Sequence, residues 1–311
     1  MTGMHILLCL QGLKAEPWVE GLQAALPDAT VSIWQPGAGQ PPADYAVVWQ
    51  PPQALLDEQP GLKALFNIGA GVDALVKLRV PPHTRIVRLD DAGMSVQMAE
   101  YVCQAVIRHF RELDAHEATM DQGRWAHRRP RLRADYPVGV MGLGVLGSRV
   151  ARALTAFEFA VNGWSRSPRA VDGVRGYAGE AQLDDFLRAS HILVCLLPLT
   201  PETEDILNHR TLGALRPGGY LVNVARGRHL VEADLLALLD EGHLAGATLD
   251  VFREEPLPAG HPFWSHPKLV LTPHTSAMTL RDDSIAQIVG KMRALAQGRP
   301  VAGLVDLDKA Y

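Results

Sequence analysis

The sequence has few cysteines, no long apolar run and no large excess of charge, and each shortage excludes a class of protein. Three cysteines in 311 residues are too sparse and too odd in number for a disulfide framework. No segment approaches the ~18 consecutive apolar residues of a transmembrane helix, so no membrane association is expected. The opening residues MTGMHILLCLQGLK have no basic lead and no small-residue cleavage site. We therefore expect a cytoplasmic protein.

Charge is nearly balanced, with 30 Lys and Arg against 34 Asp and Glu, which gives a net charge of -4. Such a chain has no overall field that attracts nucleic acid. One local exception is the segment Arg124–Arg133, with five arginines and a tryptophan in ten residues. This cluster could bind nucleic acid or polyphosphate, or it could be a solvated loop or a subunit contact. Because it is short and no nucleic-acid motif accompanies it, we predict no nucleic-acid partner.

The hydrophobic pattern is that of an α/β protein with two units. Short apolar runs alternate with helical stretches from His5 to Leu89, and a second alternation runs from Val138 to His274. Between them, residues 95–113 show helical spacing of apolar residues with no Gly or Pro, so this helix could connect two domains. A last helix is predicted at about 283–297. The length also favours two domains.

The sharpest local motif is GxGxxG at Gly142, Gly144 and Gly147, between a predicted strand and a predicted helix. Gly142 permits a tight turn, Gly144 lets the backbone approach a pyrophosphate, and Gly147 lets the helix lie close to its strand. The residues between, Val145 and Leu146, begin the helix whose N-terminus would face the phosphates. A glycine-rich turn without a ligand is the alternative, but the strand and helix context favours dinucleotide binding.

The choice of cofactor depends on the end of the next strand, where NAD-binding units place an Asp or Glu on the adenosine ribose. Here the strand ends in Asn162-Gly163-Trp164-Ser165-Arg166-Ser167, without a carboxylate. A guanidinium at Arg166, beside Ser165, can pair with a 2′-phosphate. NADP(H) is therefore favoured over NAD(H), although Arg166 could also be an ordinary solvated loop residue.

Three further segments follow in order: HILVCLLPLT from His191, LVNVARG from Leu221 and LDVFREEP from Leu249, and then TPH at 272–274. With these segments the chain resembles the D-2-hydroxyacid dehydrogenase family, and its motifs look closest to the glyoxylate/hydroxypyruvate reductase A branch. The likeness also covers VWQPP, NIGAGVD and the C-terminal VAGLVDLDKAY, so it spans nearly the whole chain.

The resemblance implies two doubly wound parallel-sheet domains, with a Rossmann nucleotide domain inserted into a flavodoxin-like substrate domain. Residues 1–95 and 282–311 would form the substrate domain, and residues 96–281 the NAD(P)-binding domain. The family's substrate-binding arginine, its proton-donating histidine and the glutamate that orients the histidine correspond here to Arg226, His274 and Glu255.

These three residue types suit the chemistry on physical grounds as well. Reduction of a 2-keto acid needs a hydride at the carbonyl carbon, a proton for the carbonyl oxygen and a fixed cation for the carboxylate. Arg226 can supply the cation. His274 can supply the proton, because a carboxylate at Glu255 would stabilise the imidazolium. The bound cofactor supplies the hydride. No metal ligand set is predicted.

The resemblance implies further contacts. On the cofactor side these are Leu197, Pro198 and Thr203 near the adenosine or pyrophosphate, and Ala225 and Asp250 near the nicotinamide. Asp250 would accept a hydrogen bond from the carboxamide NH₂. On the substrate side, backbone N–H groups of Gly69, Ala70 and Gly71 would bind the carboxylate opposite the arginine, and Trp49 would wall the pocket. A structural turn and a packed tryptophan are the alternative interpretations of these two segments.

The sequence therefore predicts an NADPH-preferring reductase of small 2-keto acids such as glyoxylate and hydroxypyruvate. Two alternatives stay open: a dehydrogenase for a larger 2-keto acid, and a nucleotide-sensing regulator related to the C-terminal-binding corepressors. By family analogy we expect a homodimer, with the apolar helix at 95–113 supplying part of the interface.

Overall fold

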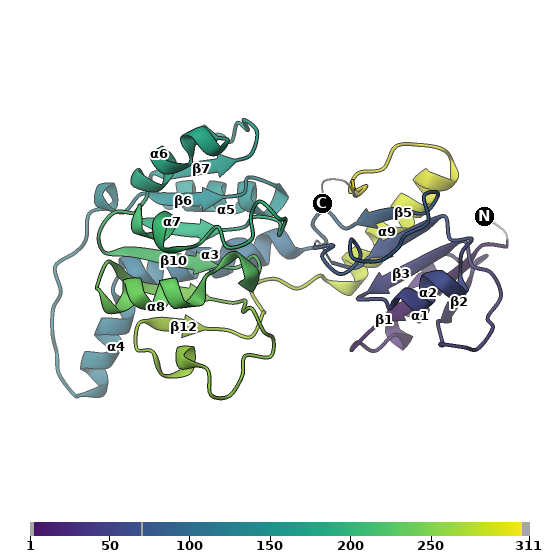
Figure 1. Ribbon diagram of the computed structural model, residues 1–311, viewed down its shortest axis with the longest axis horizontal. Helices are drawn as coiled ribbons and strands as arrows, with labels where there is room; N and C mark the ends of the chain where they lie inside the picture. Colours follow the sequence, from purple (N-terminus) through teal and green to yellow (C-terminus); the bar gives the residue numbers. More distant parts are fainter. Residues whose placement is uncertain (1–2, 70, 307–311) are drawn as a thin grey trace. The chain divides into compact units, whose positions relative to one another are not determined.

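The structure is a computed structural model that describes residues 3–69 and 71–306. The chain divides into two compact units (Figure 1). Unit 1 contains the residues up to Gly93 and those from Thr279 onward, and unit 2 is Met94–Met278. Among the described residues, no helix combines the length and the apolar composition needed to cross a membrane.

Within the described part of unit 1, five parallel strands form a sheet in the order β2-β1-β3-β4-β5. This is the flavodoxin-like order of a doubly wound sheet, as predicted. The elements of this unit are β1 (His5–Leu10), α1 (Glu16–Ala25), β2 (Thr30–Ile33), β3 (Tyr45–Trp49), α2 (Gln53–Glu58), β4 (Ala64–Asn67), β5 (Arg85–Arg88) and α9 (Arg281–Ala296).

The helix α9 belongs to unit 1, although it follows unit 2 in the sequence. Its apolar residues, including Ile288 and Met292, pack with α1 on one face of the sheet. Gly21 of α1 makes this contact possible, because a Cβ there would lie 2.5 Å from the Ile285 Cδ1 atom. The chain then returns to the sheet, where Val87 and Leu304 form an antiparallel bridge at the β5 edge.

In unit 2, all of whose residues are described, seven parallel strands have the order β12-β11-β10-β9-β6-β7-β8. Numbered within the unit this order is the Rossmann pattern 3-2-1-4-5-6 with one strand added, which confirms the predicted fold. The strands are β6 (Val138–Met141), β7 (Val161–Ser165), β8 (Val174–Ala178), β9 (Ile192–Cys195), β10 (Gly219–Asn223), β11 (Leu244–Leu249) and β12 (Leu269–Leu271).

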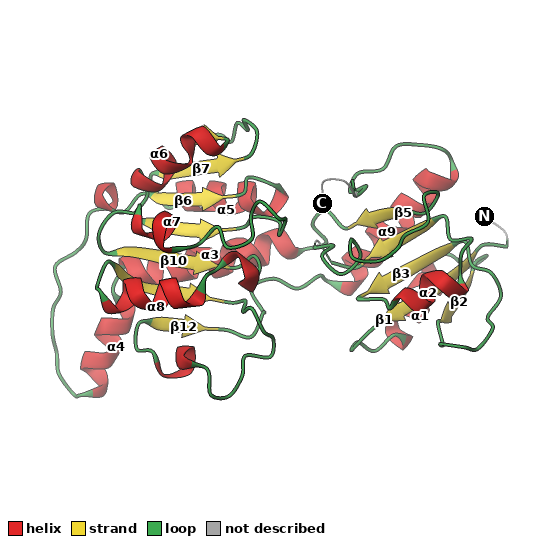
Figure 2. Cartoon of the chain, viewed as in Figure 1, coloured by secondary structure: helices red, strands yellow, loops and turns green. Residues whose placement is uncertain are grey.

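Helices cover both faces of this sheet (Figure 2). They are α3 (Met94–Phe110), α4 (Leu113–Asp121), α5 (Val145–Ala156), α6 (Leu183–Arg188), α7 (His209–Gly213) and α8 (Glu232–Asp240), with 3₁₀ turns at Arg133–Asp135, Glu180–Gln182, Gly227–His229 and Pro262–Ser265. The helices α3 and α5 share one apolar core, and α6, α7 and α8 share the other. The inner strands β6, β7, β9, β10 and β11 are mostly buried, which explains their apolar runs, whereas the edge strands β8 and β12 are partly exposed.

The bounds of the helix predicted at 95–113 need correction. The helix ends at Phe110, because Glu112 has a left-handed φ of 53°, and α4 then begins at Leu113. Apolar residues of α3 such as Val102 and Val106 are buried in the core of unit 2 itself. Val96 of the same helix is 46% exposed and α4 has no buried residue, so the contribution of 95–113 to a subunit interface stays a prediction.

Candidate active site

The predicted site residues of unit 2 gather where its strands end. In parallel strands all carboxyl ends meet at one edge of the sheet, and ligands of doubly wound folds bind there, at the point where the strand order reverses. This point lies between β6 and β9. The motifs that follow the strands at this edge start at Gly142 (β6), Arg166 (β7), Leu197 (β9), Arg226 (β10), Asp250 (β11) and His274 (β12).

The turn from β6 into α5 requires its glycines. Gly142 has φ 97°, and a Cβ there would lie 2.6 Å from the Leu196 carbonyl oxygen. A Cβ on Gly147 would lie 1.8 Å from the carbonyl oxygen of Gly142 itself. Gly144, in contrast, has no heavy atom within 4 Å of an added Cβ, so the backbone here is open to an approaching ligand. The residues present thus fit a pyrophosphate at the N-terminus of α5.

Arg166 lies in an exposed loop directly after β7. A hydrogen bond within the loop stabilises it, because the Ser165 hydroxyl donates to the Ser167 carbonyl at 2.7 Å. A second arginine in this loop, which the sequence analysis did not single out, connects it to the glycine turn. The Arg169 guanidinium donates to the Leu143 carbonyl at 3.3 Å. The segments predicted to hold the pyrophosphate and the 2′-phosphate are therefore connected by a direct hydrogen bond.

The loop after β9 is held by Thr203. Its hydroxyl donates to the Pro198 carbonyl at 2.7 Å and accepts from the Thr200 N–H at 2.8 Å. The fully buried His229, also not foreseen, has one ring nitrogen 3.2 Å from that same Pro198 carbonyl and the other 3.1 Å from the Arg226 carbonyl. This imidazole thus connects the Leu197–Pro198 segment to the arginine loop.

Arg226 follows β10 and is half-buried. The Asn223 side-chain amide donates to the Arg226 carbonyl at 3.2 Å, and the guanidinium itself donates to the Ala225 carbonyl at 2.7 Å. Gly227 is required next, because a Cβ there would lie 1.8 Å from the carbonyl carbon of Phe252. Close packing against the segment after β11 therefore fixes the backbone from which the guanidinium extends.

The structure brings His274 and Glu255 into direct contact, with 2.8 Å between Nδ1 and Oε2. The other glutamate oxygen accepts the Phe252 N–H at 3.0 Å. Partial burial by itself would raise the pKa of Glu255, but the hydrogen bonds from His274 and Phe252 and the charges of His274 and Arg226 lower it overall. Glu255 is therefore anionic at neutral pH. Its side chain is 36% exposed and that of His274 is 47% exposed, so a small molecule can reach the imidazole.

Asp250 is fully buried and organises the turn that carries His274. One carboxylate oxygen accepts from the Thr272 hydroxyl at 2.5 Å and from the Thr275 N–H at 2.8 Å, and the other accepts from the Ser276 N–H at 2.9 Å. The Asp250 carbonyl accepts the His274 N–H at 2.8 Å. Its predicted bond to a nicotinamide carboxamide stays a prediction, and its structural role in this turn is additional.

In unit 1, Trp49 and Gly69 are in contact, since a Cβ on Gly69 would lie 2.5 Å from the indole ring. The buried Asn67 amide donates to the carbonyls of Gly69 and Gly71 at 3.0 and 2.7 Å. In a trans peptide the N–H points opposite to the C=O, so the Val72 N–H points away from Asn67. Asn67 thus shapes the predicted carboxylate-binding loop. Ala70 lies outside the described residues.

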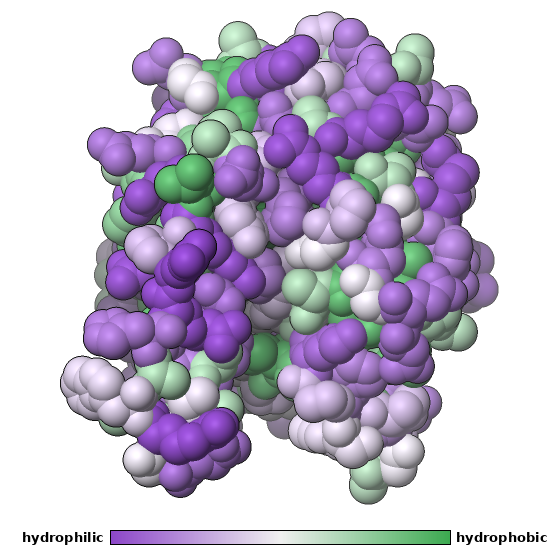
Figure 3. Space-filling view, turned by 90° about the vertical axis from the view of Figure 1, so that its left-hand side faces the viewer, coloured by the Kyte–Doolittle hydropathy of each residue, from purple (hydrophilic) through white to green (hydrophobic). Residues whose placement is uncertain are grey.

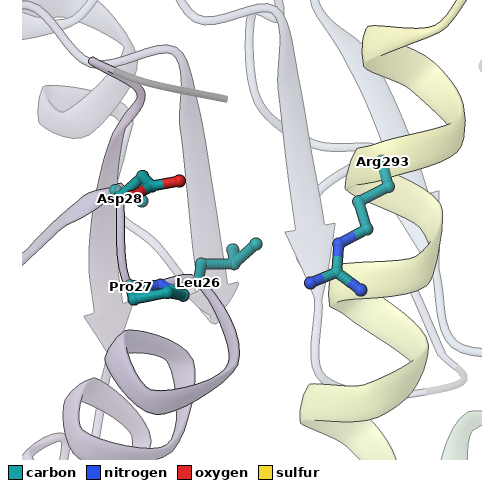
Figure 4. A pocket seen from close by; sticks show the side chains of 5 residues that line it. Leu26, Pro27, Asp28 and Arg293 are labelled. Atoms are coloured by element: carbon teal, nitrogen blue, oxygen red, sulfur yellow. The ribbon is translucent and has the colours of Figure 1, made fainter.

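A small cavity of about 120 Å³ also occurs in unit 1, beside α9 (Figure 4). It is lined by Leu26, Pro27, Asp28, Ala29 and Arg293, none of which is a predicted site residue. The Arg293 guanidinium already donates to the Ala25 carbonyl at 3.0 Å. We assign no role in the chemistry to this cavity.

Comparison with known proteins is consistent with this geometry. The family model described as D-isomer specific 2-hydroxyacid dehydrogenase, NAD binding domain, matches residues 103–276, which is more than half of the chain. The chain belongs to this family. The prediction made from the motifs is thereby confirmed, and so is its class as an NAD(P)-dependent oxidoreductase.

One curated relative and two solved structures align with nearly the whole of this chain and with the whole of their own chains. Glyoxylate/hydroxypyruvate reductase A of Yersinia enterocolitica is 44% identical over 99% of this chain and 100% of its own. A family member from Xanthobacter autotrophicus Py2, solved in complex with NADPH and MES, is 40% identical with a TM-score of 0.94 and covers 100% of both chains. The NADPH-dependent glyoxylate/hydroxypyruvate reductase of Sinorhizobium meliloti, solved with NADP and sulfate, is 36% identical over 99% of this chain and 100% of that chain, with a TM-score of 0.92.

Proposed function

We propose that this dehydrogenase reduces small 2-keto acids with NADPH, converting glyoxylate to glycolate and hydroxypyruvate to D-glycerate. The observation that carries the proposal is the bonded His274–Glu255 pair at the same sheet edge as Arg226 and the glycine turn. Relatives named glyoxylate/hydroxypyruvate reductase A, and neighbours solved with NADPH or NADP, support the choice of substrate and cofactor.

The site residues divide the cofactor, the substrate and the proton transfer among them in this proposal. Gly142, Val145, Leu146 and Gly147 lie at the pyrophosphate, and Arg166 binds the 2′-phosphate. NADPH supplies the hydride when it is bound. Arg226 holds the substrate carboxylate and stabilises the negative charge that develops on the carbonyl oxygen. His274 donates its proton to that oxygen, while Glu255 holds the imidazole through Nδ1 and leaves Nε2 for the substrate.

We further propose that unit 2 is the nucleotide-binding domain and unit 1 the substrate domain. Leu197, Pro198, Thr203 and Ala225 would border the cofactor. In unit 1 the Asn67-braced loop at Gly69 and Gly71 would bind the carboxylate through backbone N–H groups. The buried, unpaired cysteines at 9, 103 and 195 support a place in the reducing cytoplasm.

The decisive test follows the loss of NADPH absorbance with a panel of 2-keto acids of increasing side-chain size. We expect the largest kcat/KM with glyoxylate and hydroxypyruvate. A clear preference for a longer side chain would favour a dehydrogenase of a larger acid. Tight NADPH binding without turnover of any acid in the panel would instead indicate a nucleotide-sensing regulator.

The cofactor assignment predicts the effect of Arg166→Ala. Only NADPH carries the 2′-phosphate, and a charged hydrogen bond contributes about 1.5–3 kcal/mol. The KM for NADPH should therefore rise about tenfold or more, while the KM for NADH stays nearly unchanged. Arg175→Ala, at an exposed position in β8, is the matched control. Equal losses with both cofactors would mean that Arg166 only supports its loop.

The acid pair predicts a change of pH profile in Glu255→Gln. The lowered pKa of Glu255 keeps its negative charge through the neutral range, beside Nδ1 of His274. A neutral amide cannot stabilise a positively charged proton donor as a carboxylate does, so the alkaline limb of kcat/KM for keto-acid reduction should move to lower pH. If the alkaline limb of kcat/KM were the same in Glu255→Gln and the unmodified enzyme, the proposed functional pairing of Glu255 with His274 would be contradicted.

We also propose a homodimer, with residues 113–132 as part of its interface. This segment leaves large apolar side chains in solvent, and Trp125 is 83% and Leu132 69% exposed. Figure 3 shows the side of the molecule that is on the left in Figure 1, where apolar groups lie between hydrophilic ones. Arg128 and Arg131 from the basic cluster pair with Glu112 of their own unit. Sedimentation that finds only monomer at micromolar concentration would contradict this proposal.

A further inference from the structure

The segment that carries His274 is held at both ends by one face of α3. At its start, the Tyr101 hydroxyl lies 2.5 Å from the Thr272 hydroxyl. At its end, the Gln97 side-chain amide donates to the Met278 carbonyl at 2.8 Å and accepts the Met278 N–H at 3.3 Å. Residues four apart on a helix share a face, which explains how Gln97 and Tyr101 reach the same segment.

The hydrogen bond at Tyr101 has a defined direction. The Thr272 hydroxyl uses its one hydrogen to donate to the Asp250 carboxylate at 2.5 Å. Tyr101 must therefore donate to Thr272. Burial raises the pKa of Tyr101 to about 12, so the phenol keeps its hydrogen in any ordinary assay. A chain of bonds thus runs from Tyr101 through Thr272 to Asp250.

The backbone of His274 depends on such support. His274 has φ 55°, a left-handed conformation that a non-glycine residue keeps only when its surroundings hold it. Its N–H bonds to the carbonyl of Asp250, whose carboxylate holds the flanking Thr272 and Thr275. Loss of a contact in this network therefore acts on the direction in which the imidazole points.

From this network we infer that Gln97 and Tyr101 are positioning residues for the general acid: they hold the segment 272–278 so that the His274 imidazole meets Glu255 and the substrate oxygen. This inference rests on the proposed role of His274. It adds two residues of α3, more than 170 positions from Thr272 and Met278, to the groups on which turnover depends.

The same unit contains a matched control. Tyr220 donates to or accepts from the Thr248 hydroxyl at 2.8 Å, and burial raises its pKa to about 12 as well. Neither Tyr220 nor Thr248 bonds to the segment 272–278. Replacing either tyrosine with phenylalanine removes one hydroxyl that faces a threonine, part-buried at Tyr101 and buried at Tyr220, so Tyr101→Phe should lose no more thermal stability than Tyr220→Phe.

The two substitutions should differ in catalysis. An error of about 1 Å in the position of a reacting group can cost up to ~10²-fold in rate. We expect kcat to fall about tenfold in Tyr101→Phe, with the KM values for NADPH and glyoxylate nearly unchanged, whereas Tyr220→Phe should retain the kcat of the unmodified enzyme. Thr272→Val removes the same bond from its other side and should act like Tyr101→Phe, which keeps the test valid if one variant folds poorly.

A double substitution separates positioning from general damage. If Tyr101 acts through the imidazole, Tyr101→Phe should not lower the residual kcat of a His274→Ala enzyme further. A further tenfold loss in that background, or the same kcat in Tyr101→Phe and Tyr220→Phe, would overturn the positioning role. If His274→Ala alone kept full turnover, the proposed general acid itself would be wrong, so the two failures are distinguishable.

Discussion

Replacing His274 with alanine should lower kcat by about 10²–10⁴, because a positioned general acid contributes a factor of this size. The KM for NADPH should change little, since the glycine turn and the Arg166 loop are separate from His274. The KM for the keto acid should also change little, because Arg226 binds the carboxylate in this proposal. Steady-state kinetics with glyoxylate and NADPH measure all three quantities.

The left-handed backbone of His274 calls for a second variant. Alanine disfavours a φ of 55°, whereas asparagine tolerates it and cannot act as an acid at neutral pH. His274→Asn should therefore lose as much kcat as His274→Ala while better keeping the turn. His209→Ala, an exposed histidine at the start of α7, is the control and should be fully active. Near-normal turnover in both His274 variants would refute the acid assignment.

Replacing Arg226 with alanine should impair both substrate binding and turnover. Losing charged hydrogen bonds to the carboxylate, at about 1.5–3 kcal/mol, should raise the KM for glyoxylate about 10–100-fold. Losing a donor to the developing oxyanion should lower kcat about 10²–10³-fold. The KM for NADPH should stay close to its normal value, because the cofactor contacts lie elsewhere.

Two comparisons sharpen this expectation. Arg226→Lys keeps the charge but not the two-pronged geometry of the guanidinium, so its loss should be intermediate. Arg228→Ala changes an exposed arginine two residues away that pairs with Glu204 at 2.6 Å, and it should leave the kinetics with glyoxylate unchanged. If Arg226→Ala changed only kcat, Arg226 would act on the oxyanion alone and not in substrate binding.

Many features of the site could be predicted because they depend on short segments of the chain. The glycine spacing at 142–147 reflects local steric limits: a Cβ on Gly147 would overlap the carbonyl of Gly142, five residues earlier. Parallel strands put the ends of β10, β11 and β12 at one edge, so motifs that follow these strands had to meet. The alternation of apolar runs likewise indicated two α/β units.

Only the tertiary structure decided which long-range contacts support those motifs. The end of α3 at Phe110 follows from a left-handed turn at Glu112, in a segment with no Gly or Pro to indicate it. A tyrosine at helical spacing suggests a core residue, and no local pattern shows that Tyr101 reaches Thr272. The order of the motifs, together with the family resemblance, thus predicted the roles of Arg226 and His274, which stay predictions. The side chains that hold them were decided by packing between distant elements, because a hydrogen bond between residues 171 positions apart leaves no periodic trace in the sequence.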